Sequence, residues 1–157
     1  MSSSQLTPHQ QVTYSQEYKD KFQQALEFQD FVACQLMRRG LMIVQFGSQA
    51  YQERWGESAN GVEVKFDRLF RQTGNLYIET AERTSTSKGF SPSGIYRADN
   101  TWLWVIGDYQ TLFIFPKNVL QLVEKRFIPK ITATSKGYVM PLGEAKKLAA
   151  KIIKVKR

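Results

Sequence analysis

The spacing of apolar residues changes along the chain, and in the first part of the sequence it is the spacing of an α-helix. Thr13 and Gln16 have capping-box spacing, so a helix is predicted from there to about Arg39, with Gly40 ending it. Its apolar stripe consists of Phe22, Ala25, Leu26, Phe28, Val32, Leu36 and Met37. Residues 1–13 are polar and are predicted to be a flexible N-terminal arm, which leaves residues 14–157 as one domain.

Strand-like runs follow this helix. Residues 41–46 predict a buried strand, 47–61 are polar and irregular, and 62–66 and 75–81 predict two further strands. The last of these alternates, with Leu76, Ile78 and Thr80 opposing Tyr77 and Glu79. The rest of the chain predicts a loop over 84–100 with one helical turn near 94–97, a hairpin of 102–106 and 111–115, a helix over 117–126 after Pro116, and an amphipathic helix over 143–155 with a basic tail. This order indicates a mixed α/β domain with one central sheet flanked by helices.

Composition supports a folded domain and suggests a partner. Apolar residues make up 42% of the 157 residues and aromatic residues 13%, which is ample for a core. Lysine and arginine number 22 against 14 acidic residues, a formal charge of +8. This charge favours a polyanionic partner, nucleic acid first and an anionic membrane surface second, although a soluble protein can be basic without either.

Several chemistries are excluded by residue counts. One cysteine, Cys34, and one histidine, His9, leave no intrachain disulfide and no zinc site of the Cys/His type, and little for catalysis by a Cys–His or Ser–His pair. No apolar run reaches the length of about 18 residues that a membrane span requires, and Met1–Thr13 lack an apolar signal region. We therefore expect a cytoplasmic protein that stays in the compartment where it is made.

The candidate chemistry lies in the strand over 62–66. Val62, Val64 and Phe66 share one strand face, and Glu63 and Lys65 share the other. Burying a carboxylate and an ammonium in an apolar strand costs free energy, so a structural or functional role must offset that cost. They form either an edge-strand ion pair or a metal-assisted site, in which Glu63 binds a divalent cation while Lys65 positions or deprotonates a water and stabilises phosphoryl charge.

A metal site needs further acids near Glu63. Glu57 precedes the strand by a short turn, and Asn60-Gly61 is a turn dipeptide that can fold it back beside Glu63. Glu53 and Asp67 compete for this role, and Glu57 is alternatively a solvated loop acid. On the first helix, Glu27 and Asp30 lie on neighbouring parts of one face, and Glu27 is the preferred third acid.

A helix with a Glu, a strand, an acid and then a strand with Glu-x-Lys resembles the PD-(D/E)XK nuclease superfamily, over roughly residues 20–115. The resemblance implies a restriction endonuclease-like αβββαβ core and Mg²⁺-dependent hydrolysis of DNA phosphodiesters, with Mn²⁺ as a substitute. It assigns Glu63 and Lys65 to the (D/E)-x-K element, Glu57 to the preceding acid and Glu27 to the helical acid, with Glu57 and Glu63 on the metal. The upstream acid departs from the family pattern, because it is Glu rather than Asp, no Pro precedes it, and it lies only six residues before Glu63.

The expected substrate is double-stranded or branched DNA, and the restriction, homing and resolvase roles remain open. A homodimer is expected because cutting both strands of a duplex usually takes two sites. Basic residues that would neutralise phosphates lie just past the site, around the long loop and in the C-terminal run. They are Arg68, Arg71, Lys88, Arg97, Lys147 and Lys151. The alternatives are a catalytically inactive nuclease-fold DNA-binding protein, and a structural protein in which Glu63–Lys65 is only an ion pair.

Overall fold

The first helix is confirmed in the computed structural model, which describes residues 15–156. Helix α1 (Gln16–Met37) begins after Ser15, whose side chain accepts a hydrogen bond from the Tyr18 amide, and Arg38 ends it. Ser15 thus caps the helix in the way that serine commonly does. The predicted cap residue Thr13 and the predicted flexible arm lie outside the described residues.

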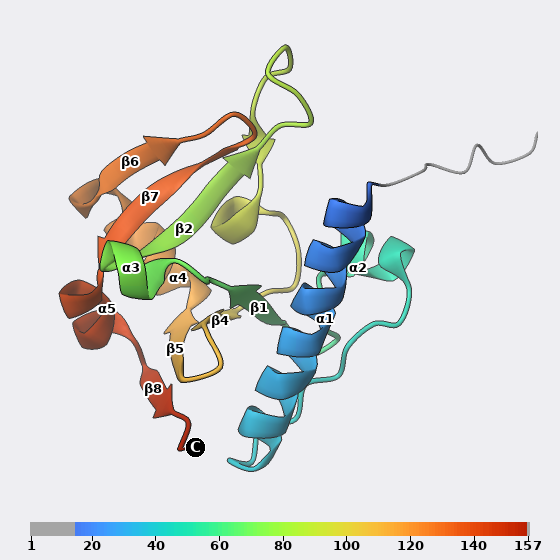
Figure 1. The fold of residues 1–157 in the computed structure, drawn as a ribbon, viewed down its shortest axis with the longest axis vertical. Helices are drawn as coiled ribbons and strands as arrows, with labels where there is room; N and C mark the ends of the chain where they lie inside the picture. Colours follow the sequence, from blue (N-terminus) through green and yellow to red (C-terminus); the bar gives the residue numbers. More distant parts are fainter. Residues whose placement is uncertain (1–14, 157) are drawn as a thin grey trace, which may run out of the picture.

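The strands form two four-stranded sheets instead of the single central sheet that we expected (Figure 1). The first sheet has the order β1-β4-β5-β8 and the second the order β3-β2-β7-β6. Only β1 and β4 pair in parallel, and every other pair is antiparallel. The strands are β1 (Val62–Phe66), β2 (Asn75–Glu82), β3 (Ser91–Pro92), β4 (Leu103–Gly107), β5 (Thr111–Pro116), β6 (Ile128–Ile131), β7 (Ser135–Pro141) and β8 (Lys151–Lys154).

Short helices connect these strands. They are α2 (Gln49–Trp55), α3 (Phe70–Thr73), α4 (Lys117–Val123) and α5 (Leu142–Leu148), with 3₁₀ turns η1 (Gly94–Tyr96) and η2 (Glu124–Arg126). The predicted helical turn near 94–97, the β4–β5 hairpin and the helix after Pro116 are therefore confirmed. The molecule is a mixed α/β protein, and within residues 15–156 no helix is long and apolar enough to cross a membrane.

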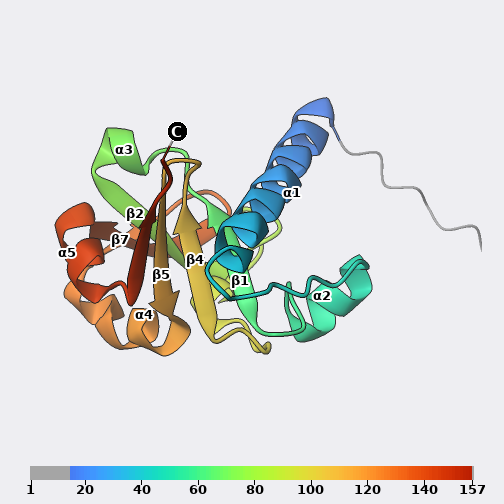
Figure 2. The same ribbon diagram turned by 90° about the horizontal axis from the view of Figure 1, so that it is seen from below.

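Two apolar clusters cover the two faces of the first sheet. Helix α1 lies against β1 (Figure 2), and Phe28 and Val32 of α1 belong to one apolar cluster with Val62 and Val64 of β1. The opposite face meets the second sheet, α4 and α5, and buries Trp104 with residues of β2 and β7. Strand β1 thus has an apolar face under α1 and a second face turned toward the second sheet. This second face carries the candidate chemistry.

Two predicted elements are wrong, and the strands β3, β6 and β7 were not predicted. Residues 41–46 form no strand: only Gln45 makes an isolated bridge, to Ser58, and Met42 and Val44 are exposed. The predicted basic helix over 143–155 ends at Leu148, and its second half is strand β8 against β5. Ile152 and Ile153 are β-branched and fit a pleated surface better than a helix. Strand β6 contains Pro129 and β7 ends at Pro141, which an edge strand and a strand end tolerate.

Candidate active site

Strand β1 brings Glu63 and Lys65 onto its inner face, as the alternation predicted. Val62 and Val64 are buried under α1, so the side chains between and after them point the other way. Glu63 is only 2% exposed, and Lys65 Nζ lies 2.8 Å from its Oε1. The two side chains therefore form a charge-assisted pair in which the carboxylate is buried and the ammonium still reaches solvent.

A second carboxylate, that of Glu57, lies against the same ammonium. Glu57 Oε1 is 3.7 Å from Lys65 Nζ, and Glu57 Oε2 accepts a hydrogen bond of 3.1 Å from the Val64 amide. Since β1 is the outer strand of its sheet, this amide has no strand partner on that side. Glu57 therefore caps the free edge of β1 and lies beside Glu63, as the sequence predicted.

The turn before β1 explains why Glu57 folds back. Ser58 Oγ accepts from the Val62 amide at 2.7 Å and donates to the Val62 carbonyl at 2.8 Å, which closes the turn. Gly61 has φ of 73°, and a Cβ at this position would lie 2.5 Å from the Asn100 carbonyl oxygen. Only glycine combines this backbone conformation with so close an approach. The Asn60-Gly61 turn is thus required for the position of Glu57.

A loop braced by a buried ion pair supports Glu63 from the other side. Thr101 Oγ1 donates to Glu63 Oε2 at 3.3 Å. Two residues earlier, the buried carboxylate of Asp99 pairs with Lys117 Nζ at 3.0 Å, and Lys117 also donates to the Arg97 carbonyl at 2.9 Å. This network fixes the loop that carries Thr101, so it helps to hold the carboxylate of Glu63 in place.

Electrostatics couple the three groups. Burial raises the pKa of Glu57, the attraction of Lys65 opposes this, and the charge of Glu63 raises the pKa further. For Lys65, burial acts to lower the pKa, but the carboxylates of Glu63 and Glu57 outweigh it and the pKa is raised. One ammonium thus serves two carboxylates, and the positive charge of Arg97 also acts to lower the pKa of Glu57.

A further acid, Glu79, belongs to the site and was not predicted as part of it. Its charge also acts to raise the pKa of Lys65. Glu79 Oε1 accepts from Ser93 Oγ at 2.9 Å, and Oε2 accepts from Ser135 Oγ at 3.0 Å. Gly94 allows η1 to approach β2 this closely, because a Cβ there would lie 2.2 Å from the Glu79 carbonyl oxygen. The available signal was the alternation itself, which set Tyr77 and Glu79 on the face opposite Leu76 and Ile78.

The other acids considered for the site have different roles. Glu27 is exposed, accepts a hydrogen bond from Gln23 at 3.3 Å, and belongs to the helix that covers the opposite face of β1. Asp30 is also exposed on this helix. Glu53 is exposed and pairs with Gln49, four residues before it on α2. Asp67 accepts hydrogen bonds from the amides of Leu69, Phe70 and Tyr77 and thereby fixes the turn after β1. The structure therefore brings together Glu57, Glu63 and Lys65 but not Glu27.

The predicted phosphate-binding residues fall into two groups. Arg71 pairs through its guanidinium with Asp108, and Arg97 donates to the carbonyls of Gln52 and Glu53, so both are engaged within the protein. Lys147 is exposed, although it pairs with Glu144 at 2.8 Å. Exposed cations also come from the turn after β1, the long loop and β8: Arg68, Lys88 and Lys151.

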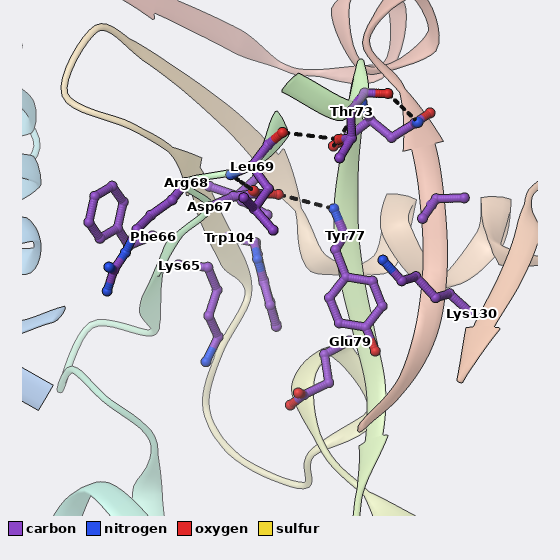
Figure 3. A pocket seen from close by; sticks show the side chains of 13 residues that line it. Lys65, Phe66, Asp67, Arg68, Leu69, Thr73, Tyr77, Glu79, Trp104 and Lys130 are labelled. Atoms are coloured by element: carbon purple, nitrogen blue, oxygen red, sulfur yellow. Dashed lines mark hydrogen bonds between the residues drawn. The ribbon is translucent and has the colours of Figure 1, made fainter. Parts of the chain in front are cut away.

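A cavity of about 760 Å³ opens beside Lys65, between the two sheets. Figure 3 shows Lys65 and Trp104 on one side and Tyr77 and Glu79 on the other. Lys65 Nζ lies 5.5 Å from the centre of the Trp104 ring. The cavity therefore adjoins the acidic cluster and shares Lys65 and Glu79 with it.

The donor set fits a hard divalent cation with an incomplete protein shell. Mg²⁺ usually takes one or two carboxylates and completes its shell with water and substrate phosphate. Glu57 and Glu63 supply such a pair. In the part of the chain that the structure describes, no group of three or more acidic, histidine or cysteine side chains is arranged to hold a metal ion. A protein-only metal cage is thus not present among these residues, whereas a two-carboxylate site is compatible with them.

Comparisons with known proteins add no assignment. No family model, no curated protein and no solved structure matches this chain. The function must therefore be argued from the site itself.

Proposed function

We propose that the chain is a Mg²⁺-dependent endonuclease that hydrolyses DNA phosphodiester bonds at the cluster of Glu57, Glu63 and Lys65. The observation that carries the proposal is the 2.8 Å contact between Lys65 and the buried carboxylate of Glu63, with Glu57 against the same ammonium. An ordinary ion pair needs one carboxylate, and this ammonium has two in contact and the charge of Glu79 nearby. A divalent cation at the two carboxylates would favour the ionised form of both.

The residues have distinct roles in this proposal. Glu63 and Glu57 would hold the cation, which would supply Lewis-acid activation of water and of the phosphate. Lys65 would orient the attacking water and stabilise the charge that develops on the phosphate. Thr101 is a positioning residue, because it acts through its hydrogen bond to Glu63. The formal charge of +8 supports a polyanionic substrate.

The test is cleavage of plasmid and branched DNA by the purified protein in Mg²⁺ and in EDTA. We expect cleavage only in Mg²⁺, and a loss of at least about 100-fold in Glu63→Gln and Lys65→Ala, the scale on which catalytic groups contribute. Glu27→Gln is the matched control, because it removes an acid that the structure places away from the site. Equal activity in EDTA, or equal loss in the control, would contradict the proposal.

A DNA-binding protein without catalysis is the second candidate, and the same +8 charge favours it. It predicts salt-sensitive DNA binding that is unchanged by Mg²⁺ and that survives Glu63→Gln. Binding without cleavage of any DNA form would support this candidate over the nuclease. A homodimer and the restriction endonuclease-like core remain predictions under either function.

A further inference from the structure

The cavity beside Lys65 has the chemistry of a nucleotide pocket. Its volume of about 760 Å³ lies within the range of about 300–1,000 Å³ that is usual for small-ligand sites. Its apolar and aromatic lining comes from both sheets and from the turn after β1: Phe66, Leu69, Tyr77, Trp104, Ile106 and Val139. Such a lining suits a flat, uncharged ring better than a phosphate chain.

Positively charged side chains also line the cavity, and they suit the phosphates that flank the base of a nucleotide. Arg68 and Lys130 line the cavity together with Lys65 and the acids Asp67 and Glu79, and of these Arg68 and Lys130 are exposed. Lys130 Nζ lies 5.8 Å from the centre of the Tyr77 ring, so a cation and an aromatic surface adjoin each other. A nucleotide carries both partners, an aromatic base and an anionic backbone.

One residue of the lining, Trp104, has an unused hydrogen-bond donor. The indole N–H of Trp104 is buried and has no partner among residues 15–156, while the Trp104 ring lines the cavity. Buried donors are nearly always satisfied in native proteins, so an unpaired donor needs a reason.

We infer that this cavity receives one unpaired nucleotide of the DNA substrate, next to the phosphate that the proposed nuclease cleaves. The inference rests on the proposed function, in which the neighbouring acids Glu57 and Glu63 cleave the phosphodiester. It narrows the substrate from DNA in general to DNA with an unpaired base. A paired base is stacked inside the duplex and cannot enter the cavity, whereas a bulged base leaves the stack at little cost.

The test is binding in EDTA to two DNA hairpins that differ only in a single-nucleotide bulge, measured by fluorescence anisotropy. We expect the bulged hairpin to bind about 10-fold more tightly, because stacking of one base is worth about 1–3 kcal/mol. With 2-aminopurine at the bulge, its fluorescence should change when the protein binds. Equal affinity for the two hairpins overturns the inference.

Two matched pairs of variants locate the effect. Leu69→Trp fills the cavity from an exposed position and should abolish the preference, whereas Leu122→Trp, at an exposed position of α4 outside the cavity lining, should keep it. Lys130→Ala should reduce binding of the bulged hairpin more than Lys125→Ala, which removes an equal charge outside this lining. A preference retained in Leu69→Trp overturns the inference, and circular dichroism checks that each variant is folded.

The same hairpins with Mg²⁺ separate this inference from the proposed function. Bulge preference without cleavage supports the cavity assignment and contradicts the nuclease. Cleavage without bulge preference supports the nuclease and contradicts the cavity assignment.

Discussion

Lys65 Nζ lies 2.8 Å from Oε1 of Glu63, a side chain two residues earlier on the same strand that is only 2% exposed. Residues i and i+2 of a strand share a face, so the contact follows directly from the extended backbone. The strand lies at the edge of its sheet, and the Val64 amide, which has no strand partner on that side, donates a hydrogen bond to the Glu57 carboxylate. Sheet edge, turn and alternation together produce a cluster of two carboxylates on one ammonium.

Glu79 offers a test of which acids take part in catalysis. We expect Glu79→Gln to reduce Mg²⁺-dependent DNA cleavage by at least about 10-fold, because it removes a charge that acts on Lys65. Glu82→Gln is the control, since Glu82 is exposed near the end of the same strand. The measurement is the cleavage rate at saturating Mg²⁺, and equal rates for both variants would show that Glu79 only braces Ser93 and Ser135.

The buried pair of Lys117 and Asp99 should stabilise the loop that carries Thr101. Lys117→Met leaves the Asp99 carboxylate buried without its closest cation, and breaking a buried pair in this way costs about 3–5 kcal/mol. Urea denaturation measures this loss in the free energy of unfolding. The exposed Lys125→Met should change it by less than about 0.5 kcal/mol. If Lys117→Met costs no more than this control, Lys117 does not hold the loop.

Asp108 predicts a dependence of stability on pH. Burial acts to raise its pKa, but hydrogen bonds from Arg71 and from the amides of Gln110 and Thr111 outweigh it, and the pKa is lowered. The ionised form therefore stabilises the fold above the unfolded-state pKa of about 3.9, and this contribution is lost as the pH falls through the lower folded-state pKa.

Asp108→Ala should accordingly lower the free energy of unfolding by about 1–2 kcal/mol at pH 7, with the difference from the parent protein narrowing below about pH 4. Chemical denaturation between pH 2.5 and 7 measures both effects. Asp20→Ala, at an exposed position of α1, should show only a small difference at every pH. A difference for Asp108→Ala that does not narrow in acid would contradict this account.

The parts of the fold that local pattern determines were predictable. The alternation in 62–66 and 75–81 gave both strands their correct inner faces, and glycine at position 61 indicated the turn that returns Glu57 to Glu63. Short apolar runs were not predictable in the same way. Residues 41–46 have strand composition, but Asn60 bonds the Met42 carbonyl and the Val44 amide through its side chain, and no neighbouring strand is available.

The candidate site required contacts between distant residues. The charge of Glu79 acts on Lys65 only because the second sheet packs opposite the first, and no local pattern reports how two sheets face each other. Glu27 was chosen on helical position alone, but α1 covers the apolar face of β1, opposite Lys65. Side-chain alternation predicted which face each residue occupies, and only the three-dimensional arrangement determined which faces meet.

The most direct test of the account is the position of a bound Mn²⁺ ion in a crystal of the protein, located by anomalous scattering. The account predicts a peak within about 2.0–2.3 Å of carboxylate oxygens from both Glu57 and Glu63, adjacent to Lys65. A crystal of Glu63→Gln should lack this peak. Mn²⁺ bound elsewhere, or no peak at Glu63 in the parent protein at millimolar Mn²⁺, would contradict the assignment of this cluster as the metal site of a nuclease.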